Sequence, residues 1–369
     1  MKILTISPDA GDVSPSESPV IERFRWYGSL VDQFDVIGPA NTDGKTDLSD
    51  TTHLYRVGGS NKLVKVWRLV RACDRLMKQN AYIVLSTRDP YFVGLVAVYF
   101  AKKYGIGLEL QVHGFEKRSW LRTRLAQYVV RHADGIRAVS ERLKAHLIQD
   151  FSVNAKKILV SPIFLDGRRF AERATAMGER MRAPSDPFVF VTVSRLVPVK
   201  NIAMQIHALA KIKQAFDVKL VIVGDGPCRQ ELEALARERD VKKNVVFTGA
   251  VSDPTPFFHE ADAFLLTSFS EGYGMAPIEA ACFGLPIIMT DVGCANEVIV
   301  DEINGFVIPV HDERALVAAM KRLIQEPETQ ERMHQENKKL FEKLPTLQKT
   351  LRLYRESWNA VEKRGNARS

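Results

Sequence analysis

The chain has 369 residues, of which 46% are hydrophobic and 26% charged, a composition typical of a folded protein with two domains of roughly 150–200 residues each. No apolar run reaches the roughly 18–20 residues that a membrane-spanning helix needs, and the N-terminus lacks a secretory signal, so we expect a cytoplasmic protein. The formal net charge is +8, and residues 1–165 carry all of it, with 24 Lys/Arg against 16 Asp/Glu. Such a basic half is compatible with nucleic acid, an anionic membrane surface or phosphorylated substrates.

Strand-like and helix-like segments alternate through this first half. The alternation predicts parallel strands joined by helical crossovers. Amphipathic helices are expected over Lys62–Gln79 and Pro90–Tyr104. The predicted strands are Lys2–Ser7, Phe34–Gly38, Leu54–Val57, Tyr82–Ser86, Gly107–Val112 and Gly135–Ser140.

One basic stretch in this half, Lys117–Arg131, has an apolar side that includes Trp120, Leu121 and Tyr128. A helix of this kind can lie on an anionic membrane. It can equally pack its apolar side against the first domain and leave its cations in water. The residues alone leave both interpretations open.

Residues 162–187 lose the alternation and end in a Pro- and Ser-bearing patch, so we place the interdomain region there. The alternation then resumes, and Asn201 is predicted to cap a helix. Two doubly wound domains in tandem explain this pattern best. The remaining predicted elements are strands Phe188–Ser194, Lys219–Val223, Val245–Thr248, Ala261–Ser268 and Pro286–Thr290, a strand after Asn304-Gly305, and helices Arg229–Arg239, Glu313–Gln325 and about Pro345–Lys363.

Glu271 and Glu279 bracket a short segment after the predicted strand Ala261–Ser268. We expect Glu271 on the loop beyond that strand and Glu279 at the opening of the next helix. Ligands of open parallel sheets bind at this edge, and a helix N-terminus there favours phosphate, while carboxylates accept hydrogen bonds from hydroxyls. Alternatively, Glu279 satisfies the helix dipole. That alternative does not explain why Gly272 and Gly274 leave the loop bare.

Arg195 and Lys200 follow the strand Phe188–Ser194. If the strands are parallel, both cations emerge at the same sheet edge as Glu271. Arginine can bind two phosphate oxygens at once, and lysine adds a mobile point charge. A surface loop with two solvated cations is the alternative interpretation.

Two weaker motifs follow later strands. Gly224-Asp-Gly-Pro227 either lets a ligand approach the backbone closely or forms a tight strand-to-helix turn. Phe247, in Phe-Thr-Gly, can stack beside a flat base, although a strand phenylalanine usually packs in the core.

In their order along the chain, these motifs resemble the retaining GT-B glycosyltransferases of family four. The likeness spans roughly residues 185–330 and includes Asn304-Gly-Phe-Val307. It implies an α/β fold with two Rossmann-like doubly wound domains facing across a cleft. Residues 1–165 would bind the acceptor, completed by a crossing helix at about 345–363, and residues 185–340 would bind the nucleotide-sugar donor.

The resemblance also implies the site. Family members use the first glutamate for the donor sugar, the second for the ribose, the two cations for the diphosphate and helix-start amides for the rest of its cradle. A histidine near the donor sugar and acceptor matches His113, whereas the family's glycine-rich first loop is absent, since Asp9–Glu17 contains one glycine. Carried over, the catalytic residues are Glu271, Arg195, Lys200 and His113, and the donor-binding residues are Glu279, Gly274, Met275, Ala276, Gly224 and Phe247.

The implied activity is retaining transfer of a sugar from a UDP- or GDP-linked donor to a glycan or lipid-linked acceptor, in polysaccharide or glycolipid synthesis. No cofactor or metal is implied, the four cysteines lack metal-ligand spacing, and no nucleic-acid recognition motif is present. Because several family members act on lipid-linked acceptors, peripheral contact with the inner face of a membrane through Lys117–Arg131 is expected. The alternatives are a nucleotide-sugar epimerase on the same architecture and a non-catalytic relative that only binds nucleotide sugar.

Overall fold

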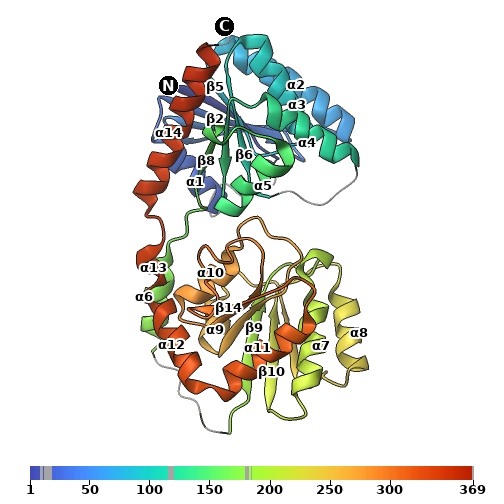
Figure 1. Ribbon diagram of the computed structural model, residues 1–369. Helices are drawn as coiled ribbons and strands as arrows, with labels where there is room; N and C mark the ends of the chain where they lie inside the picture. The colour runs from blue at the N-terminus through green and yellow to red at the C-terminus, as the bar shows by residue number, and fades with distance from the viewer. Residues whose placement is uncertain (9–10, 12–18, 115–119, 179–182, 184, 368–369) are drawn as a thin grey trace. The chain divides into compact units, whose positions relative to one another are not determined.

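The computed structural model describes residues 1–8, 11, 19–114, 120–178, 183 and 185–367 (Figure 1). The chain divides into two compact units: unit 1 comprises Met1–Ile163 and Leu347–Ser369, and unit 2 comprises Phe164–Thr346. Each unit has a sheet with helices on both faces (Figure 1), so the predicted α/β class with two doubly wound sheets is confirmed.

Unit 1 contains an eight-stranded sheet in the order β3-β4-β2-β1-β5-β6-β7-β8. All neighbouring strands are parallel except β3 and β4, which are antiparallel. Six strands correspond to the predicted ones, whereas β3 and β8 were not predicted. The bounds are β1 Lys2–Ile6, β2 Gln33–Pro39, β3 Gly44–Ser49, β4 Thr52–Val57, β5 Val84–Thr87, β6 Gly107–Val112, β7 Gly135–Ala138 and β8 Ile158–Val160.

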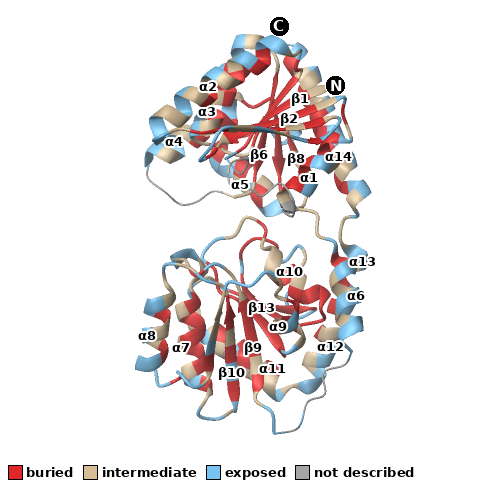
Figure 2. Ribbon diagram, turned by 180° about the vertical axis from the view of Figure 1, so that it is seen from behind, coloured by how far each residue is buried: buried red, intermediate tan, exposed pale blue. Residues whose placement is uncertain are grey.

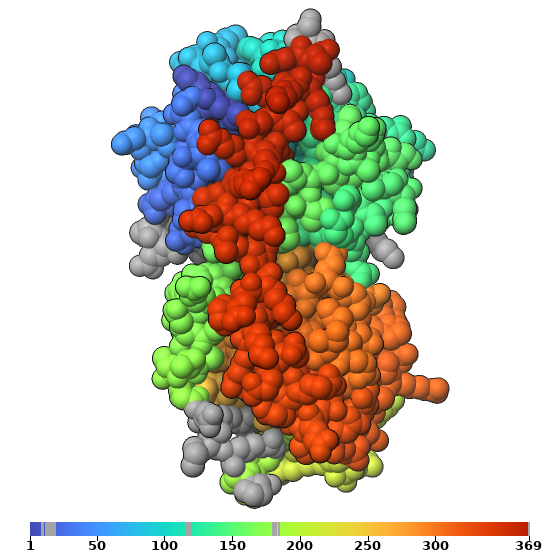
Figure 3. Space-filling view, turned by 60° about the vertical axis from the view of Figure 1, so that its left-hand side comes forward, coloured from blue at the N-terminus to red at the C-terminus, as the bar shows by residue number. Residues whose placement is uncertain are grey.

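The C-terminal helix α14 (Leu347–Asn366) completes the core of unit 1, where it packs on β6 and β7. Trp358 is fully buried, and its Nε1 donates to Glu109 Oε2 over 3.1 Å. The outer side of this helix lies on the surface (Figure 3). The other helices of unit 1 are α1 Pro19–Gly28, α2 Lys62–Gln79, α3 Phe92–Tyr104, α4 Trp120–His132 and α5 Glu141–Phe151.

Unit 2 contains a six-stranded, fully parallel sheet in the order β11-β10-β9-β12-β13-β14. Its strands are buried between helices (Figure 2). The strands are β9 Phe188–Val193, β10 Val218–Val223, β11 Val245–Gly249, β12 Ala263–Leu266, β13 Ile287–Thr290 and β14 Gly305–Ile308. The helices are α6 Gly167–Met177, α7 Ile202–Ile212, α8 Arg229–Glu238, α9 Thr255–His259, α10 Met275–Cys282, α11 Glu313–Gln325, α12 Pro327–Lys338 and α13 Leu340–Lys343.

Residues 162–187, which the sequence predicts as the interdomain region, contain helix α6, which contacts α10 within unit 2. Gly167 opens this helix at a site where an added Cβ would lie 2.9 Å from Leu344 Cδ1 and 3.0 Å from Cys282 Sγ. The helix therefore packs as part of unit 2.

Asn201 occupies the N-cap position of α7, as the sequence predicts, but it does not act through the expected capping hydrogen bond. Its backbone is left-handed (φ 48°, ψ 43°), and its side chain makes no capping hydrogen bond. It follows a single tight turn, Pro198–Lys200, and the left-handed residue turns the chain from that turn into α7. An asparagine tolerates this conformation better than most residues, which explains the choice of residue by a different mechanism.

No helix within the described residues is both long and apolar enough to cross a bilayer.

Candidate functional site

The candidate site lies in unit 2 where the direction of strand addition reverses. From β9 the chain proceeds to β10 and β11 on one side, whereas β12, β13 and β14 lie on the other side. Because β9 and β12 are parallel neighbours, the loops that follow them leave the same edge of the sheet. Such a switch point opens a crevice beyond the carboxyl ends of the strands, where ligands of open α/β sheets bind.

Lys200 and Glu271 meet at this edge. Lys200 Nζ lies 2.6 Å from Glu271 Oε1, and Ser268 Oγ donates to the same oxygen over 2.6 Å. The two charged side chains are only 18% and 11% exposed. The loops are also joined through their backbones, because Phe269 N donates to Val199 O over 2.8 Å. A sheltered carboxylate is thus held by two donors at one oxygen.

The sequence predicted neither this ion pair nor Ser268. It placed both charged residues at one edge, but it assigned Lys200 to a phosphate and Glu271 to a sugar. Ser268 gave no signal, since a serine at a strand end is common.

Arg195 lies at the same edge of the sheet, two residues after the end of β9. Its side chain is exposed, and no ion pair joins it to another described residue. The next residue, Leu196, is fully buried, and its N–H donates to Asp225 O over 2.9 Å. The backbone beneath the guanidinium is therefore fixed, while the guanidinium itself remains available.

The glycines of the 224–227 turn serve this loop. An added Cβ at Gly224 would lie 1.9 Å from Ser194 O, and one at Gly226 would lie 2.4 Å from Leu196 O. The close backbone approach that the motif indicated is thus an approach to the Arg195 loop. This geometry gives Gly224 a structural role.

Phe247 is partly buried and packs against the hydrophobic core of unit 2. Of the two interpretations of this residue, the structure favours core packing over stacking beside a base.

Helix α10 begins at Met275, directly after the loop that carries Glu271. Gly274 precedes it in a left-handed conformation (φ 86°), no side chain caps the helix, and its first turn contains no acidic residue. The first N–H groups of a helix have no intrahelical acceptor and carry the positive end of its dipole. The amides at Met275 and Ala276 therefore favour an anion.

Glu279 does not open α10 as predicted; it is the fifth residue of that helix. It is partly buried, and burial raises the pKa of its carboxyl group. Since it lies beyond the first turn, capping the helix does not explain it.

The loop that carries Glu271 packs against the segment that follows β13. Cys294 N donates to Tyr273 O over 2.7 Å. At Gly293, whose φ is +56°, an added Cβ would lie 2.5 Å from Tyr273 O and 2.9 Å from Glu271 Cβ. Only glycine fits at this position.

We predict that Gly293→Ala lowers the free energy of unfolding by roughly 2–4 kcal/mol, the sum of the left-handed backbone penalty and a clash with backbone. Gly105→Ala is the control, because Gly105 has φ +64° with nothing within 4 Å of the added Cβ. It should cost only the backbone penalty, about 1–2 kcal/mol. Chemical denaturation measures both, and equal losses would contradict the close packing beneath Glu271.

His113 lies in unit 1, directly after β6. It is partly buried, and burial together with the charges of Arg88, Arg137 and Arg23 lowers the pKa of His113 to about 3. The imidazole is therefore neutral near pH 7, with one nitrogen donor and one acceptor. The sequence did not indicate the surrounding arginines. The loop Asp9–Glu17 that departs from the family pattern lies almost wholly outside the described residues.

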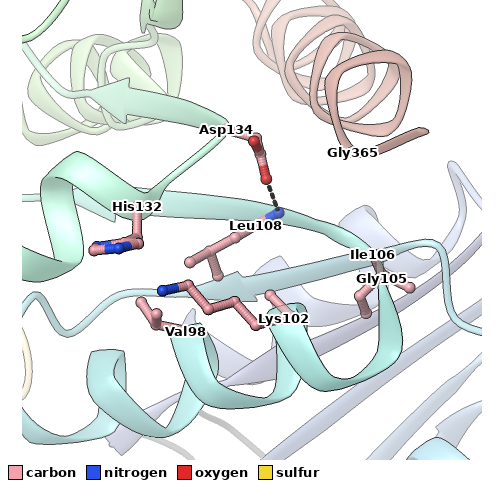
Figure 4. A pocket seen from close by; sticks show the side chains of 9 residues that line it. Val98, Lys102, Gly105, Ile106, Leu108, His132, Asp134 and Gly365 are labelled. Atoms are coloured by element: carbon pink, nitrogen blue, oxygen red, sulfur yellow. Dashed lines mark hydrogen bonds between the residues drawn. The ribbon is translucent and has the colours of Figure 1, made fainter. Parts of the chain in front are cut away.

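A pocket of ≈ 210 Å³ in unit 1 contains none of the predicted residues (Figure 4). It lies at the start of β6, the opposite end from His113, and its polar lining includes Lys102, His132 and Asp134. Asp134 Oδ2 accepts a hydrogen bond from Leu108 N over 3.0 Å (Figure 4), so part of this lining holds the sheet together. Within the described chain, no group of three or more His, Cys, Asp or Glu side chains is placed to hold a metal ion.

Two family models match the chain. Residues 176–340 match glycosyl transferases group 1, and residues 32–168 match glycosyltransferase family 4. The two matches together span most of both units.

Curated relatives share moderate identity with the chain. An alpha-monoglucosyldiacylglycerol synthase of Streptococcus pneumoniae is 26% identical over 72% of this chain and 64% of its own length. A GDP-mannose-dependent alpha-(1-6)-phosphatidylinositol monomannoside mannosyltransferase of Mycolicibacterium smegmatis is 31% identical over 58% of this chain and 60% of its own. The chain therefore spans less than two thirds of these relatives.

Among solved structures, the HepE protein of Anabaena in complex with UDP superposes with a TM-score of 0.76, covering 97% of this chain and 100% of that one. The sequence identity is 18%, so the likeness concerns the fold.

Proposed function

Because the chain belongs to the glycosyl transferases of group 1 and has their GT-B fold, we propose that it transfers a sugar from a nucleotide diphosphate-sugar to a hydroxyl group, with retention of anomeric configuration. The donor would bind to unit 2 and the acceptor to unit 1. We expect UDP or GDP on the donor and a glycan or lipid-linked acceptor.

The observation that carries this proposal is the grouping at the switch point of unit 2. An exposed arginine, a sheltered Lys200–Glu271 pair and an uncapped helix start all lie at one sheet edge. A ligand that suits this set has a diphosphate and a hydroxyl-rich part. Arg195 and the amides of α10 would bind the diphosphate, and Glu271 would accept hydrogen bonds from the sugar through Oε2, which the Lys200 and Ser268 contacts leave open. Glu279 would face the ribose.

The chemical step that we propose is the one that the family resemblance implies. The bond between the anomeric carbon and the diphosphate breaks, the acceptor oxygen bonds to the same face of that carbon, and the acceptor proton passes to the departing phosphate oxygen. Negative charge grows on the diphosphate in the transition state, where fixed cations and amides stabilise it most. We expect Arg195 and Lys200 to supply this stabilisation without a resident metal ion.

The relatives' names support a lipid-linked acceptor. The streptococcal relative is named for a glucosyldiacylglycerol, and the mycobacterial one for a phosphatidylinositol mannoside. Both names describe glycolipids, although they differ in the sugar. We therefore propose a glycolipid or a lipid-linked glycan as the acceptor class.

The first test is thermal stabilisation by donors. Since a ligand that binds only the folded state stabilises it by mass action, a donor at about 100 times its Kd should add roughly 2.7 kcal/mol. We predict that UDP- or GDP-linked sugars raise Tm and that Arg195→Ala reduces the shift only in part, because most of the contribution of Arg195 falls in the transition state. No stabilisation by any sugar of either nucleotide would contradict the proposal.

Donor incubated alone separates the alternatives. An epimerised sugar would indicate an epimerase, and donor binding without turnover under any acceptor would indicate a binding protein.

A further inference from the structure

Three helices of unit 1 form one layer. α2, α3 and α4 lie side by side on one face of the sheet, while α14 packs on β6 and β7 (Figures 1 and 2). The layer is held together by polar contacts: Asp74 of α2 pairs with Lys103 of α3, and Lys102 of α3 donates to Tyr128 of α4. Its outer surface is therefore a single continuous face.

This helix layer is strongly basic. Its helices, of 18, 13 and 13 residues, contain eleven Lys/Arg and one acid, Asp74, which gives a net charge of +10 against +8 for the entire chain. The single acid is already paired with Lys78 and Lys103. Positive charge at this density attracts an anionic surface.

The same layer exposes large apolar side chains. Of the fifteen large hydrophobic residues that are exposed within the described chain, eight lie on these three helices. Leu63 is 83% exposed, Trp120 76% and Trp67 55%. Arg71 stacks on Trp67, with its guanidinium carbon 4.0 Å from the ring centroid. A solvated basic face has no need of such side chains, whereas a membrane-bound face uses both the cations and the apolar groups.

Several of these apolar residues lie at the end of the layer where the helices begin. β4 runs parallel to β2, and β5 runs parallel to both β1 and β6. The helices that follow β4, β5 and β6 therefore all start at the carboxyl edge of the sheet. Leu63, Phe92 and Trp120 are each the first or second residue of their helix, and each is exposed. His113 follows β6 at this same edge.

We propose that the helix layer docks on an anionic lipid membrane, with the helix starts inserted and the basic face against the headgroups. α2 is as much a part of this surface as the α4 region that the sequence indicated. The inference deepens the proposed function, because it brings a lipid-linked acceptor to the carboxyl edge of the unit 1 sheet. We propose lipid rather than nucleic acid as the partner, because purely electrostatic binding to a nucleic acid would not require the exposed apolar side chains.

The test uses the full chain with vesicles of phosphatidylcholine alone and of phosphatidylcholine mixed with phosphatidylglycerol. We expect binding to the mixed vesicles only, and a blue shift of the emission from Trp67 and Trp120. Arg71→Glu with Arg75→Glu should weaken binding about a hundredfold. Leu63→Ala with Trp67→Ala should weaken it about tenfold.

The matched control is Lys242→Glu with Lys243→Glu, an equal charge reversal at two exposed lysines of unit 2, which should bind as the unchanged protein does. Equal weakening by the control, or unchanged binding after loss of Leu63 and Trp67, would overturn the proposal. So would binding to double-stranded DNA that competes fully with vesicles and ignores the apolar substitutions.

The vesicle assay requires no sugar transfer. Vesicle binding without donor stabilisation would refute the proposed function alone, and donor stabilisation without vesicle binding would refute the docking surface alone.

Discussion

Replacement of Glu271 by glutamine is expected to lower the rate of sugar transfer about 100-fold while the protein remains folded. The glutamine keeps the size of the side chain and removes the charge that Lys200 and Ser268 now hold in place. A hydrogen bond to a charged group contributes about 1.5–3 kcal/mol, and tenfold in rate corresponds to about 1.4 kcal/mol. Steady-state kinetics with saturating acceptor measure the effect.

The control is Glu238→Gln. Glu238 is an exposed glutamate at the C-terminal end of α8, at the opposite edge of the same sheet from Glu271. Its activity should equal that of the unchanged enzyme. Lys200→Met should reduce activity as well, and the double substitution should lose less than the sum of the single effects, because each residue holds the other. Full activity in Glu271→Gln with an unchanged melting curve would remove this residue from the site.

The sequence predicted those elements for which the spacing of apolar residues and the residues at the boundaries indicate the same helix or strand. Lys62–Gln79 is found as predicted, because its apolar residues recur with helical spacing and Asn61 accepts a hydrogen bond from Val64 N at its start. Strand β3 was not predicted, since it is an antiparallel edge strand with one buried residue, Leu48, and edge strands lack an apolar run. The short strand β8 has only three residues.

The site was predictable to the level of the sheet edge and no further. Two loops after parallel strands had to share an edge, and Arg195, Lys200 and Glu271 do. Which charged groups pair depends on side-chain rotamers and on the close contact of the loops, and neither leaves a pattern in the sequence. The start of α10 shows the same limit. Pro277 lies in the first turn of the helix and Gly284 follows its end, but neither residue fixes where the helix begins, so the sequence places Glu279 a turn too early.

Replacement of Arg195 by alanine is expected to lower the rate of transfer by roughly 10²–10⁴-fold, the largest effect of any single substitution in unit 2. Two charge-assisted hydrogen bonds to the diphosphate would be lost, at about 1.5–3 kcal/mol each. Lys200 contributes charge but cannot replace these two hydrogen bonds, because an ammonium group lacks the planar pair of donors and is also paired with Glu271 at 2.6 Å. The fold should be unaffected, because Arg195 is exposed and the loop beneath it is held by Leu196.

Arg195→Lys distinguishes charge from geometry at this position. A lysine restores the charge without the planar pair of donors, so it should recover part of the activity and leave a deficit of about tenfold or more. Arg239→Ala, which removes an exposed arginine just beyond α8, is the matched control and should be fully active. Because the charge on the diphosphate is greatest in the transition state, the loss in Arg195→Ala should fall mainly on kcat. A loss confined to KM would mean that Arg195 binds the donor equally in its ground state and does not assist departure of the diphosphate.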